Sequence, residues 1–248
     1  MNPQFEIRNK VCVITGGSGF LGSQFSSALT EAGALTINWD LSASPAVDIT
    51  DPAAVKQALE HTAAAYGKID VLIHAAALNA MPGTRENDQQ FAPYETYDRE
   101  LWEKELRLNL SAAHYVTQAI APVMMRQKEG SIIFIASDLA LIAPQNSIYD
   151  QDKFKDIAYV TSKSGMLGLM RAWAAYLGPY NVRANALVPG GMYRNQPDEF
   201  VRRNGVLNML GRMARDGEYN GAILFLSSMA SSYMTGASLV IDGGRTAW

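Results

Sequence analysis

Short β-rich runs alternate with longer segments of helical periodicity along almost the whole chain, and this alternation limits the fold more than any other feature. The β-rich runs occupy residues 11–15, 35–40, 70–76, 131–137, 182–188 and 238–242. Helical segments are expected up to residue 33 and at 51–66, 97–128, 157–178 and 217–229. Because such alternation pairs strands in parallel through right-handed crossovers, it predicts a doubly wound α/β fold with helices on both faces of the sheet. A further short strand ending at residues 48–49 brings the expected sheet to about seven strands.

Length and composition fit one large domain. The chain has 248 residues, so we expect a single α/β domain spanning 1–248. Hydrophobic residues make up 48% and charged residues 18%, which allows a large core and excludes disorder for most of the chain. The net charge is −3, and lysines and arginines form no cluster, so nucleic acid is not expected as a partner.

The sequence also disfavours a secreted, membrane-spanning, disulfide-bonded or metal-binding protein. The N-terminal residues lack the apolar run of a signal peptide, and no run is long enough to span a membrane, so we expect a cytoplasmic protein with no membrane partner. Cys12 is the only cysteine, which excludes an internal disulfide and a Cys-based zinc site and favours a buried apolar role. No metal site is expected, because His61, His74 and His114 lack ligand spacing.

A glycine-rich turn joins the first predicted strand to the first predicted helix. Its sequence is Thr-Gly-Gly-Ser-Gly-Phe-Leu-Gly at 15–22, and the candidate cofactor-binding residues are Gly16, Ser18, Gly19, Phe20, Leu21 and Gly22. Glycines there permit a tight turn and a close approach of backbone to a pyrophosphate, which then lies at the helix N-terminus. A glycine-rich turn also occurs as a purely structural feature, so its position between strand and helix is what favours dinucleotide binding.

Acidic residues further along refine the cofactor prediction. Asp40, at the end of the second predicted strand, is placed to accept both ribose hydroxyls and would repel a 2′-phosphate. Residues 38–47 contain no Arg or Lys to receive such a phosphate, so we predict NAD rather than NADP. Asp48 and Ile49 are candidates to hold the adenine, and capping of the helix that begins near Asp51 is an equally open role for Asp48.

A tyrosine and a lysine four residues apart form the candidate proton-transfer pair. Tyr159 and Lys163 lie in a segment of helical period, so their side chains share one face. A tyrosine with a pKa of about 10 is a poor base at neutral pH, and a nearby cation is expected to lower that pKa. Ser137, at the end of a predicted strand, is placed to bond a substrate oxygen, and Asn109 to hold a water that relays protons through Lys163.

Together these residues resemble the short-chain dehydrogenase/reductase family, in its compact single-domain branch, over essentially the whole chain. The matching positions are 15–22, Asp40, Asp48, Ile49, Asn109, Ser137, Tyr159, Lys163, Pro189, Gly190 and the ending 235–244. The resemblance implies a Rossmann fold and reversible hydride transfer between NAD and a secondary alcohol or ketone. It also implies a catalytic set of Asn109, Ser137, Tyr159 and Lys163.

The resemblance assigns roles to individual positions. Tyr159 would be the general acid and base, Ser137 would orient the substrate, and Lys163 would lower the Tyr159 pKa and bind the nicotinamide ribose. Further cofactor contacts would come from the backbone at Ala75, Ala76, Ala77, Pro189, Gly190 and Met192, in addition to Tyr159 and Lys163. The family is commonly dimeric or tetrameric, and the helices at 97–128 and 157–178 would form the interface. The apolar character of nearly every face of the second helix favours the same burial.

Four features depart from the family pattern. Phe20 stands where compact members usually have glycine, which gives the glycine spacing of the extended branch. His74 replaces an asparagine after the fourth predicted strand, and a core or surface histidine, rather than a metal ligand, is the favoured interpretation. The interval between Ser137 and Tyr159 is long, so 144–156 is expected to be an insertion. Arg194 lies near the nicotinamide, either facing an anionic substrate group or, as we favour, in solvent.

Three irregular segments, 79–96, 144–156 and 189–208, follow predicted strands and should therefore surround the substrate. The polar residues expected there are Tyr94, Tyr97, Tyr149, Asp150, Asp152 and Lys153. Polar walls favour a polar or sugar-derived alcohol, and residues 195–201 and the C-terminal end are similar to family members that act on sugar acids. Two alternatives stay open: a sugar epimerase or dehydratase that retains NAD, and a non-catalytic dinucleotide-binding regulator.

Overall fold

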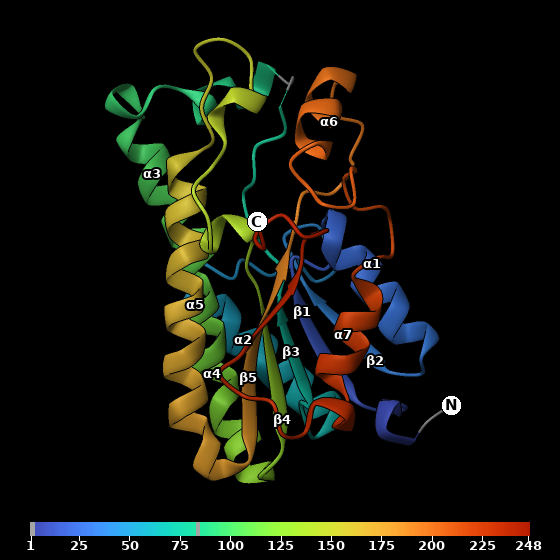
Figure 1. Ribbon diagram of the computed structural model, residues 1–248. Helices are drawn as coiled ribbons and strands as arrows, with labels where there is room; N and C mark the ends of the chain where they lie inside the picture. The colour runs from blue at the N-terminus through green and yellow to red at the C-terminus, as the bar shows by residue number, and fades with distance from the viewer. Residues whose placement is uncertain (1–2, 83–84) are drawn as a thin grey trace.

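A parallel sheet of six strands forms the centre of the molecule (Figure 1). The structure is a computed structural model that describes residues 3–82 and 85–248. The strands are β1 (Val11–Thr15), β2 (Leu35–Trp39), β3 (Val71–His74), β4 (Gly130–Ile135), β5 (Val182–Pro189) and β6 (Ser238–Ile241). Their order is β2-β1-β3-β4-β5-β6, with every neighbouring pair parallel. The predicted doubly wound α/β fold is confirmed.

One predicted strand is absent from the described sheet. Residues 47–49 belong to no described strand, and Val47 N donates to Asp40 O while Asp48 O accepts from Asp51 N. These local bonds use a donor and an acceptor that a strand partner would need. The expectation of about seven strands was therefore too high by one.

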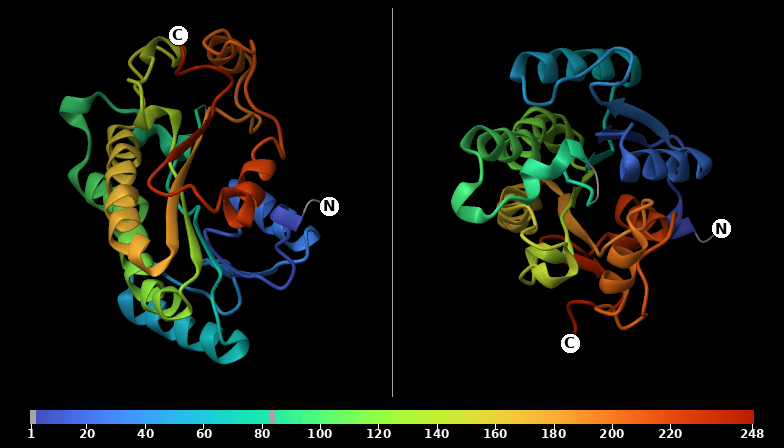
Figure 2. Two further views of the ribbon diagram at one scale, coloured as in Figure 1. Left: turned by 60° about the horizontal axis from the view of Figure 1, so that its bottom comes forward. Right: turned by 90° about the horizontal axis from the view of Figure 1, so that it is seen from above.

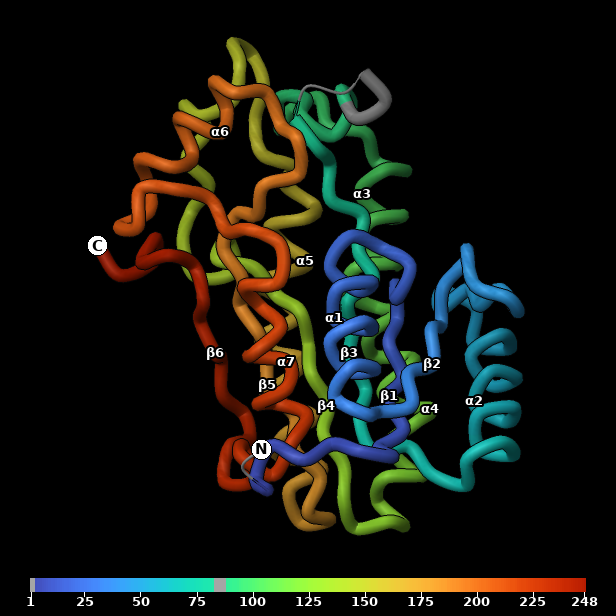
Figure 3. Tube along the Cα trace, turned by 90° about the vertical axis from the view of Figure 1, so that its right-hand side faces the viewer, coloured from blue at the N-terminus to red at the C-terminus, as the bar shows by residue number. Residues whose placement is uncertain are grey.

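Seven α-helices are described, and five of them cover the two faces of the sheet (Figures 1 and 3). Their bounds are α1 (Phe20–Glu31), α2 (Pro52–Tyr66), α3 (Arg99–Leu106), α4 (Ala112–Gln127), α5 (Ile157–Leu177), α6 (Asp198–Gly205) and α7 (Asn220–Ser227). Helices α1 and α7 cover one face, and α2, α4 and α5 cover the other. The long helix predicted at 97–128 is α3 and α4 joined by a π-helical turn at Arg107–Ser111. Helix α6 was not predicted. No helix in these described ranges is long and apolar enough to cross a membrane.

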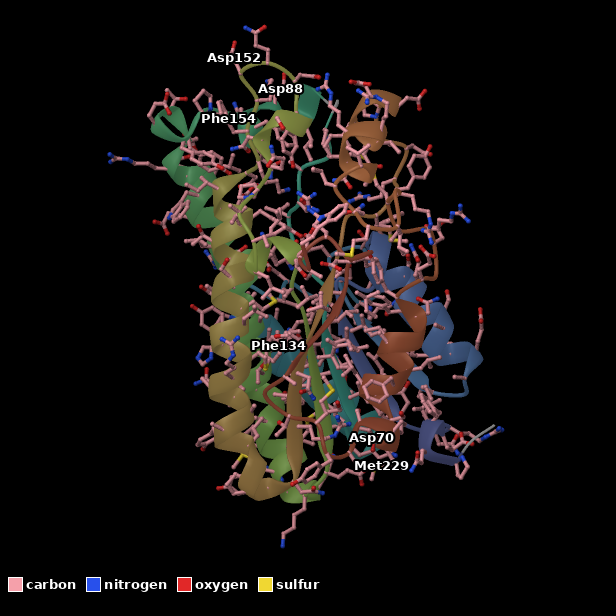
Figure 4. All side chains as sticks on the ribbon, viewed as in Figure 1. Asp70, Asp88, Phe134, Asp152, Phe154 and Met229 are labelled. Carbon is pink, nitrogen blue, oxygen red and sulfur yellow. The ribbon has the colours of Figure 1, made fainter. Side chains whose placement is uncertain are left out.

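Two hydrophobic cores lie on opposite sides of the strands. In β1, Val13 faces one core while Cys12 and Ile14 face the other, as the alternation of side chains along a strand requires. In β4, Phe134 faces the core shared with α4 and α5, and its position in the middle of the sheet is visible in Figure 4. Cys12 is fully buried, as predicted, and burial raises the pKa of its thiol to about 12.

The caps of the helices fix where the functional side chains begin. Helices α2, α3 and α5 each start at an aspartate whose carboxylate accepts a backbone N–H of the first turn. For α5 this residue is Asp156, which accepts from Tyr159 N at 3.0 Å. The loops that follow the strands gather at one end of the sheet, seen from above in the right-hand view of Figure 2. The chain also ends there, with Trp248 Nε1 donating to Leu207 O at 3.0 Å.

Candidate active site

A cavity of about 550 Å³ opens at the carboxyl ends of the strands. Its walls come from the loop after β1, the ends of β2 to β5, the first turns of α5 and the segment 189–208. Arg245, near the C-terminus, completes the lining. The cavity lies where doubly wound sheets bind their ligands, on the side predicted from the sequence.

The glycine loop brings backbone together where a side chain would not fit. Gly16 has φ +67°, and a Cβ on it would lie 2.6 Å from the Cα of Ala76. A Cβ on Gly22 would lie 2.1 Å from the carbonyl oxygen of Gly16. Helix α1 begins behind this loop at Gly19 with no side-chain cap. An uncapped helix N-terminus behind a close-packed glycine turn fits the pyrophosphate of a dinucleotide.

Asp40 is fixed at the end of β2, at the edge of this loop. Its carboxylate accepts from Ser18 N at 3.2 Å and from Ser42 N at 2.8 Å. Ser18 itself is not part of the cavity wall and holds Asp40 instead. The other predicted residues of the loop do line the cavity: Gly16, Gly19, Phe20, Leu21 and Gly22.

Asp48 and Ile49 line the same cavity. Asp48 Oδ1 accepts from Thr50 N at 2.8 Å and from Thr50 Oγ1 at 2.7 Å, which closes a turn before α2. The helix cap is Asp51, whose carboxylate accepts from Ala53 N at 2.9 Å. The alternative that Asp48 caps this helix is therefore wrong, while its contact with adenine stays a prediction.

Two stretches of backbone complete the wall on the cofactor side. The predicted positions Ala75, Ala76, Ala77, Pro189, Gly190 and Met192 all line the cavity. Tyr219 donates its hydroxyl hydrogen to Gly190 O at 3.0 Å, and Gln196 Nε2 donates to Met192 O at 2.9 Å. These bonds hold the chain after β5 in a fixed path beside the glycine loop.

Tyr159 and Lys163 lie on the inner face of α5, as predicted. They are 8% and 2% exposed, and Lys163 Nζ is 5.6 Å from the centre of the Tyr159 ring. Lys163 donates to Ile135 O at 2.6 Å, and burial lowers its pKa to about 7. The expected lowering of the Tyr159 pKa is not found. Burial raises the pKa of this phenol, and the hydrogen bond with Ser137 opposes that shift only in part.

Ser137 stands opposite Tyr159 at the end of β4 and is part of a buried polar chain. Its hydroxyl donates to Asp138 Oδ1 at 2.8 Å, and Asp138 Oδ2 lies 3.3 Å from Nε of Arg245. Both charged side chains are less than a tenth exposed. Burial raises the pKa of Asp138, while Ser137 and the Arg245 guanidinium oppose the shift. The orientation of the Ser137 hydroxyl is thereby coupled to the C-terminal segment.

Asn109 lies behind the cavity rather than in its wall. It occupies the π-helical turn between α3 and α4 and is fully buried. Its side chain accepts from Leu78 N at 2.7 Å and donates to Leu78 O at 3.0 Å. The amide therefore holds the loop after β3, and a water relay at this position stays a prediction.

Comparison with known proteins decides the family. Residues 23–246 match the family model described as enoyl-(acyl carrier protein) reductase. The 3-oxoacyl-[acyl-carrier-protein] reductase FabG of Thermotoga maritima is 30% identical to this chain over 96% of its length and 98% of the relative. The chain belongs to the short-chain dehydrogenase/reductase family.

Two further comparisons agree with this assignment. D-threitol dehydrogenase of Mycolicibacterium smegmatis is 29% identical, with 98% of this chain and 95% of the relative covered. A solved short chain dehydrogenase from Leptospira borgpetersenii with bound NAD+ is 26% identical, has a TM-score of 0.88 and covers 99% of this chain and 96% of its own. As a short-chain dehydrogenase/reductase, this protein is an NAD(P)-dependent oxidoreductase that acts on CH–OH groups.

His74 has the role of a core side chain in this short-chain dehydrogenase/reductase. It is 2% exposed, stacks on Phe134 with ring centres 4.9 Å apart, and its Nε2 lies 2.8 Å from Thr117 Oγ1. Because Thr117 donates its own hydrogen to Ala113 O, Nε2 must carry the proton of the neutral ring. Burial and the charge of Lys163 lower the His74 pKa to about 3, so the ring stays neutral. Of the two roles left open, core or surface, the structure shows the core role.

Arg194 is only partly exposed to solvent, whereas the favoured expectation placed it in solvent. Its guanidinium lies over the ring of Phe20, 4.6 Å from the ring centre, and it lines the cavity. The phenylalanine that departs from the compact pattern thus has a partner on the segment 189–208. The contact is a cation–π interaction, which brings this segment to the start of α1.

The prediction that six polar side chains line the substrate side of the cavity is correct for one of them only. Of the six side chains expected there, Tyr149 lines the cavity. Lys153 pairs with Asp88 at 3.1 Å, and Figure 4 shows Asp88 and Asp152 at the outer tip of the molecule. Residues 83–84 of the expected segment 79–96 lie outside the described residues.

The cavity instead contains polar residues that the sequence did not single out. They are Asn79, Asp138, Gln145, Lys155, Gln196, Asn204 and Arg245. Lys155 and Asn79 come from different insertions and meet through a hydrogen bond of 2.8 Å. No local spacing relates them, so only the long interval before Tyr159 hinted that this segment reaches the site. Among the residues that the structure describes, no group of three His, Cys, Asp or Glu side chains is placed to hold a metal ion.

Proposed function

We propose that the protein is an NAD-dependent dehydrogenase that interconverts a secondary alcohol and a ketone on a polar, hydroxylated substrate. One observation carries this proposal. Tyr159, Ser137 and Lys163 line the same cavity as the glycine loop and Asp40. A proton-transfer group and a dinucleotide cradle in one cavity are what hydride transfer to a carbonyl requires.

The residues divide the chemistry between them. Bound nicotinamide supplies or accepts the hydride. Tyr159 is protonated at neutral pH because burial raises its pKa, so its hydroxyl donates a proton to the carbonyl oxygen in the reducing direction. In the oxidising direction Tyr159 first releases its own proton to solvent, and the phenolate oxygen then takes the proton of the alcohol. Ser137 bonds the same substrate oxygen, and Lys163 binds the nicotinamide ribose.

The preference for NAD rests on Asp40. Its carboxylate lines the cavity next to the glycine loop and has no cation within ion-pair distance in the described part of the chain. A 2′-phosphate at this position would meet an uncompensated negative charge. We expect Asp40→Ser to narrow the ratio of kcat/KM for NAD over NADP by at least about tenfold, a loss of about 1.4 kcal/mol of discrimination. A ratio unchanged by the substitution would argue against this role.

The polar substrate is supported by the cavity and by one relative. The cavity that Tyr159 lines is also lined by side chains able to bond hydroxyl groups, among them Asn79, Gln145 and Asn204. D-threitol dehydrogenase acts on a small polyol, as its name states, and aligns along nearly the whole chain. Alcohols with neighbouring hydroxyl groups should therefore be oxidised with higher kcat/KM than simple apolar alcohols.

The experiment follows NADH formation with NAD and NADP supplied separately, over alditols, aldonic acids, cyclic alcohols and unsubstituted aliphatic alcohols. Turnover with NAD that is lost in Tyr159→Phe supports the proposal. Conversion of a sugar with no net NADH would favour the NAD-retaining epimerase or dehydratase. Binding of NAD without any turnover would favour the non-catalytic regulator.

A homo-oligomer is part of the same proposal. The outer face of α5 exposes Gly168, Ala172 and Ala175, and Trp173 beside them is only partly buried. A helix with small residues along its outer side permits close approach of a second copy. We therefore propose a homodimer or homotetramer with α4 and α5 in its interface, to be measured by light scattering after size-exclusion chromatography.

A further inference from the structure

Lys155 is a buried cation with a single neutral hydrogen-bond partner. The residue is 5% exposed, and its Nζ donates to Asn79 Oδ1 at 2.8 Å. Its backbone is held as well, since Lys155 N donates to Asn146 Oδ1 at 3.0 Å. Among the described side chains, which leave out those of residues 83–87, no carboxylate lies within ion-pair distance of this ammonium group. Two of its three N–H bonds therefore have no protein acceptor in the described structure.

The ammonium group lies at the reacting end of the cavity. Lys155 lines the cavity together with Ser137 and Tyr159, and its Nζ is 4.2 Å from the centre of the Tyr159 ring. A substrate whose reacting oxygen bonds to Tyr159 and Ser137 would thus place its adjacent carbon atoms within reach of Lys155. The position fits a group attached at or next to the carbon that reacts.

The other cations of the described cavity differ from Lys155 in their partner or in their burial. Arg245 is paired with Asp138, and Arg194 lies over Phe20. Lys163 donates to a backbone carbonyl and is assigned to the cofactor ribose. Of these side chains, Lys155 is therefore the nearly fully buried cation beside Ser137 and Tyr159 that has neither a carboxylate partner nor an assigned cofactor role, and its further contact is with the Tyr159 ring.

Electrostatics favours an anionic partner for such a group. Burial of an ammonium ion without a counter-ion is costly, and a charged partner recovers more of that cost than a neutral oxygen does. Burial lowers the pKa of Lys155 to about 8, and Asp156, Asp138 and Glu105 oppose the shift from a distance, so the side chain keeps its charge at neutral pH.

We propose that Lys155 binds a carboxylate of the substrate, so that the substrate is a hydroxy acid in the oxidising direction and an oxo acid in the reducing direction. The carboxylate lies at or beside the reacting carbon and bonds to Nζ, while Asn79 holds the ammonium group in place. This inference rests on the proposed function, because it concerns the substrate of the same site.

The test compares each aldonic acid of four to six carbons with the alditol that has the same hydroxyl stereochemistry. The wild-type enzyme should have a kcat/KM at least tenfold higher for its best acid than for the matching alditol. Lys155→Met keeps the length of the side chain and removes its charge, and should lower the ratio of acid to alditol about 100-fold. The matched control is Lys153→Met, which removes an exposed lysine from the same segment and should leave both substrates unaffected.

A second variant guards against misfolding of Lys155→Met. Asn79→Asp places a carboxylate next to the same ammonium group. The new aspartate should form an ion pair with Lys155 and compete with the substrate carboxylate, so the acid-to-alditol ratio of kcat/KM should fall to a similar extent. Calorimetric binding of the best acid to the wild type in the presence of NAD, compared with Lys155→Met, provides a readout independent of turnover. The dissociation constant should rise at least 30-fold in the variant.

Several results would overturn the inference. A wild-type preference for alditols would do so, as would an unchanged acid-to-alditol ratio in Lys155→Met. If the variant instead moved the pH dependence of kcat for both substrate classes alike, Lys155 would act through Tyr159 and not on a carboxylate. Absence of turnover with every alcohol would count against the proposed function, and the calorimetric comparison, made with each acid of the series in turn, would then still decide the role of Lys155.

Discussion

A buried pair of carboxyl groups behind the active site should make stability depend on pH in a defined direction. Glu105 is fully buried in α3, and Asp156 is 1% exposed at the start of α5. The hydroxyl of Tyr97 lies 3.0 Å from Glu105 Oε2 and 2.9 Å from Asp156 Oδ1. Gln90 Nε2 also bonds to Glu105. The single hydroxyl hydrogen of Tyr97 can bond only one of the two carboxylates at a time. A protonated Glu105 completes the network, because its own hydrogen can then be donated to the Tyr97 oxygen.

Burial raises the pKa of Glu105 from 4.5 to about 7, and the hydrogen bond and charge of Asp156 act in the same direction. The folded protein therefore binds more protons than the unfolded chain between these values, and its stability falls as pH rises from about 4.5 to about 7. The contribution is fully present below the unfolded pKa. At about 1.4 kcal/mol per pH unit the loss would reach about 3 kcal/mol, and sharing of the proton with Asp156 reduces our expectation to about 1.5 kcal/mol.

Glu105→Gln removes this dependence, because an amide donates to Tyr97 and accepts from Gln90 without titrating. The variant and the wild type should melt at similar temperatures at pH 5, and the variant should melt about 3–6 °C higher at pH 8. Thermal unfolding followed by circular dichroism measures the difference. Glu103→Gln is the control, since it changes an exposed carboxylate of the same helix. A difference between Glu105→Gln and wild type that stays constant from pH 5 to pH 8 would refute the reasoning.

Three further predictions concern binding, stability and assembly. Gly22→Ala forces a Cβ against Gly16 O, at 2.1 Å in the present backbone, so calorimetry should show NAD binding weakened at least about tenfold. Arg245→Met leaves Asp138 buried without its cation and should lower the free energy of unfolding by about 3 kcal/mol in a denaturant titration, with recovery on adding Asp138→Asn. Ala172→Glu puts a charge on the outer face of α5 and should convert the oligomer to monomers in light scattering, while an unchanged mass would contradict the proposed interface.

The parts of the fold that local spacing dictates could be predicted from the sequence. The glycine turn must follow a strand and open a helix, and the four-residue spacing of Tyr159 and Lys163 places both on one helical face. The strand β4 ends beside Ser137 because its apolar run ends there. These relations involve a few neighbouring residues, so one sequence suffices to see them.

The errors arise where tertiary contacts override local pattern. Val47, Asp48 and Ile49 have the composition of a short strand, yet Val47 N bonds to Asp40 O and Asp48 closes a turn before α2. The Tyr159 pKa was expected to fall because of Lys163, and burial of the phenol outweighs that cation. Lys153 was placed in the site and Lys155 was not, although they are two residues apart. Only the folded position of Asn79 distinguishes them, and nothing in the local pattern gives it.

The long segment between Ser137 and Tyr159 contributes two functional side chains. The segment 144–156 ends in Lys155 and Asp156, whose side chains enter two different environments. Asp156 caps α5 and joins the carboxyl pair with Glu105, so it fixes where the helix of Tyr159 begins. Lys155, one residue earlier, reaches the cavity and lies over the Tyr159 ring. The same turn thus anchors the proton-transfer residue on one side and presents a cation to the substrate on the other. For this reason a specificity-determining charge can be carried by the insertion without displacing the residues that perform the reaction.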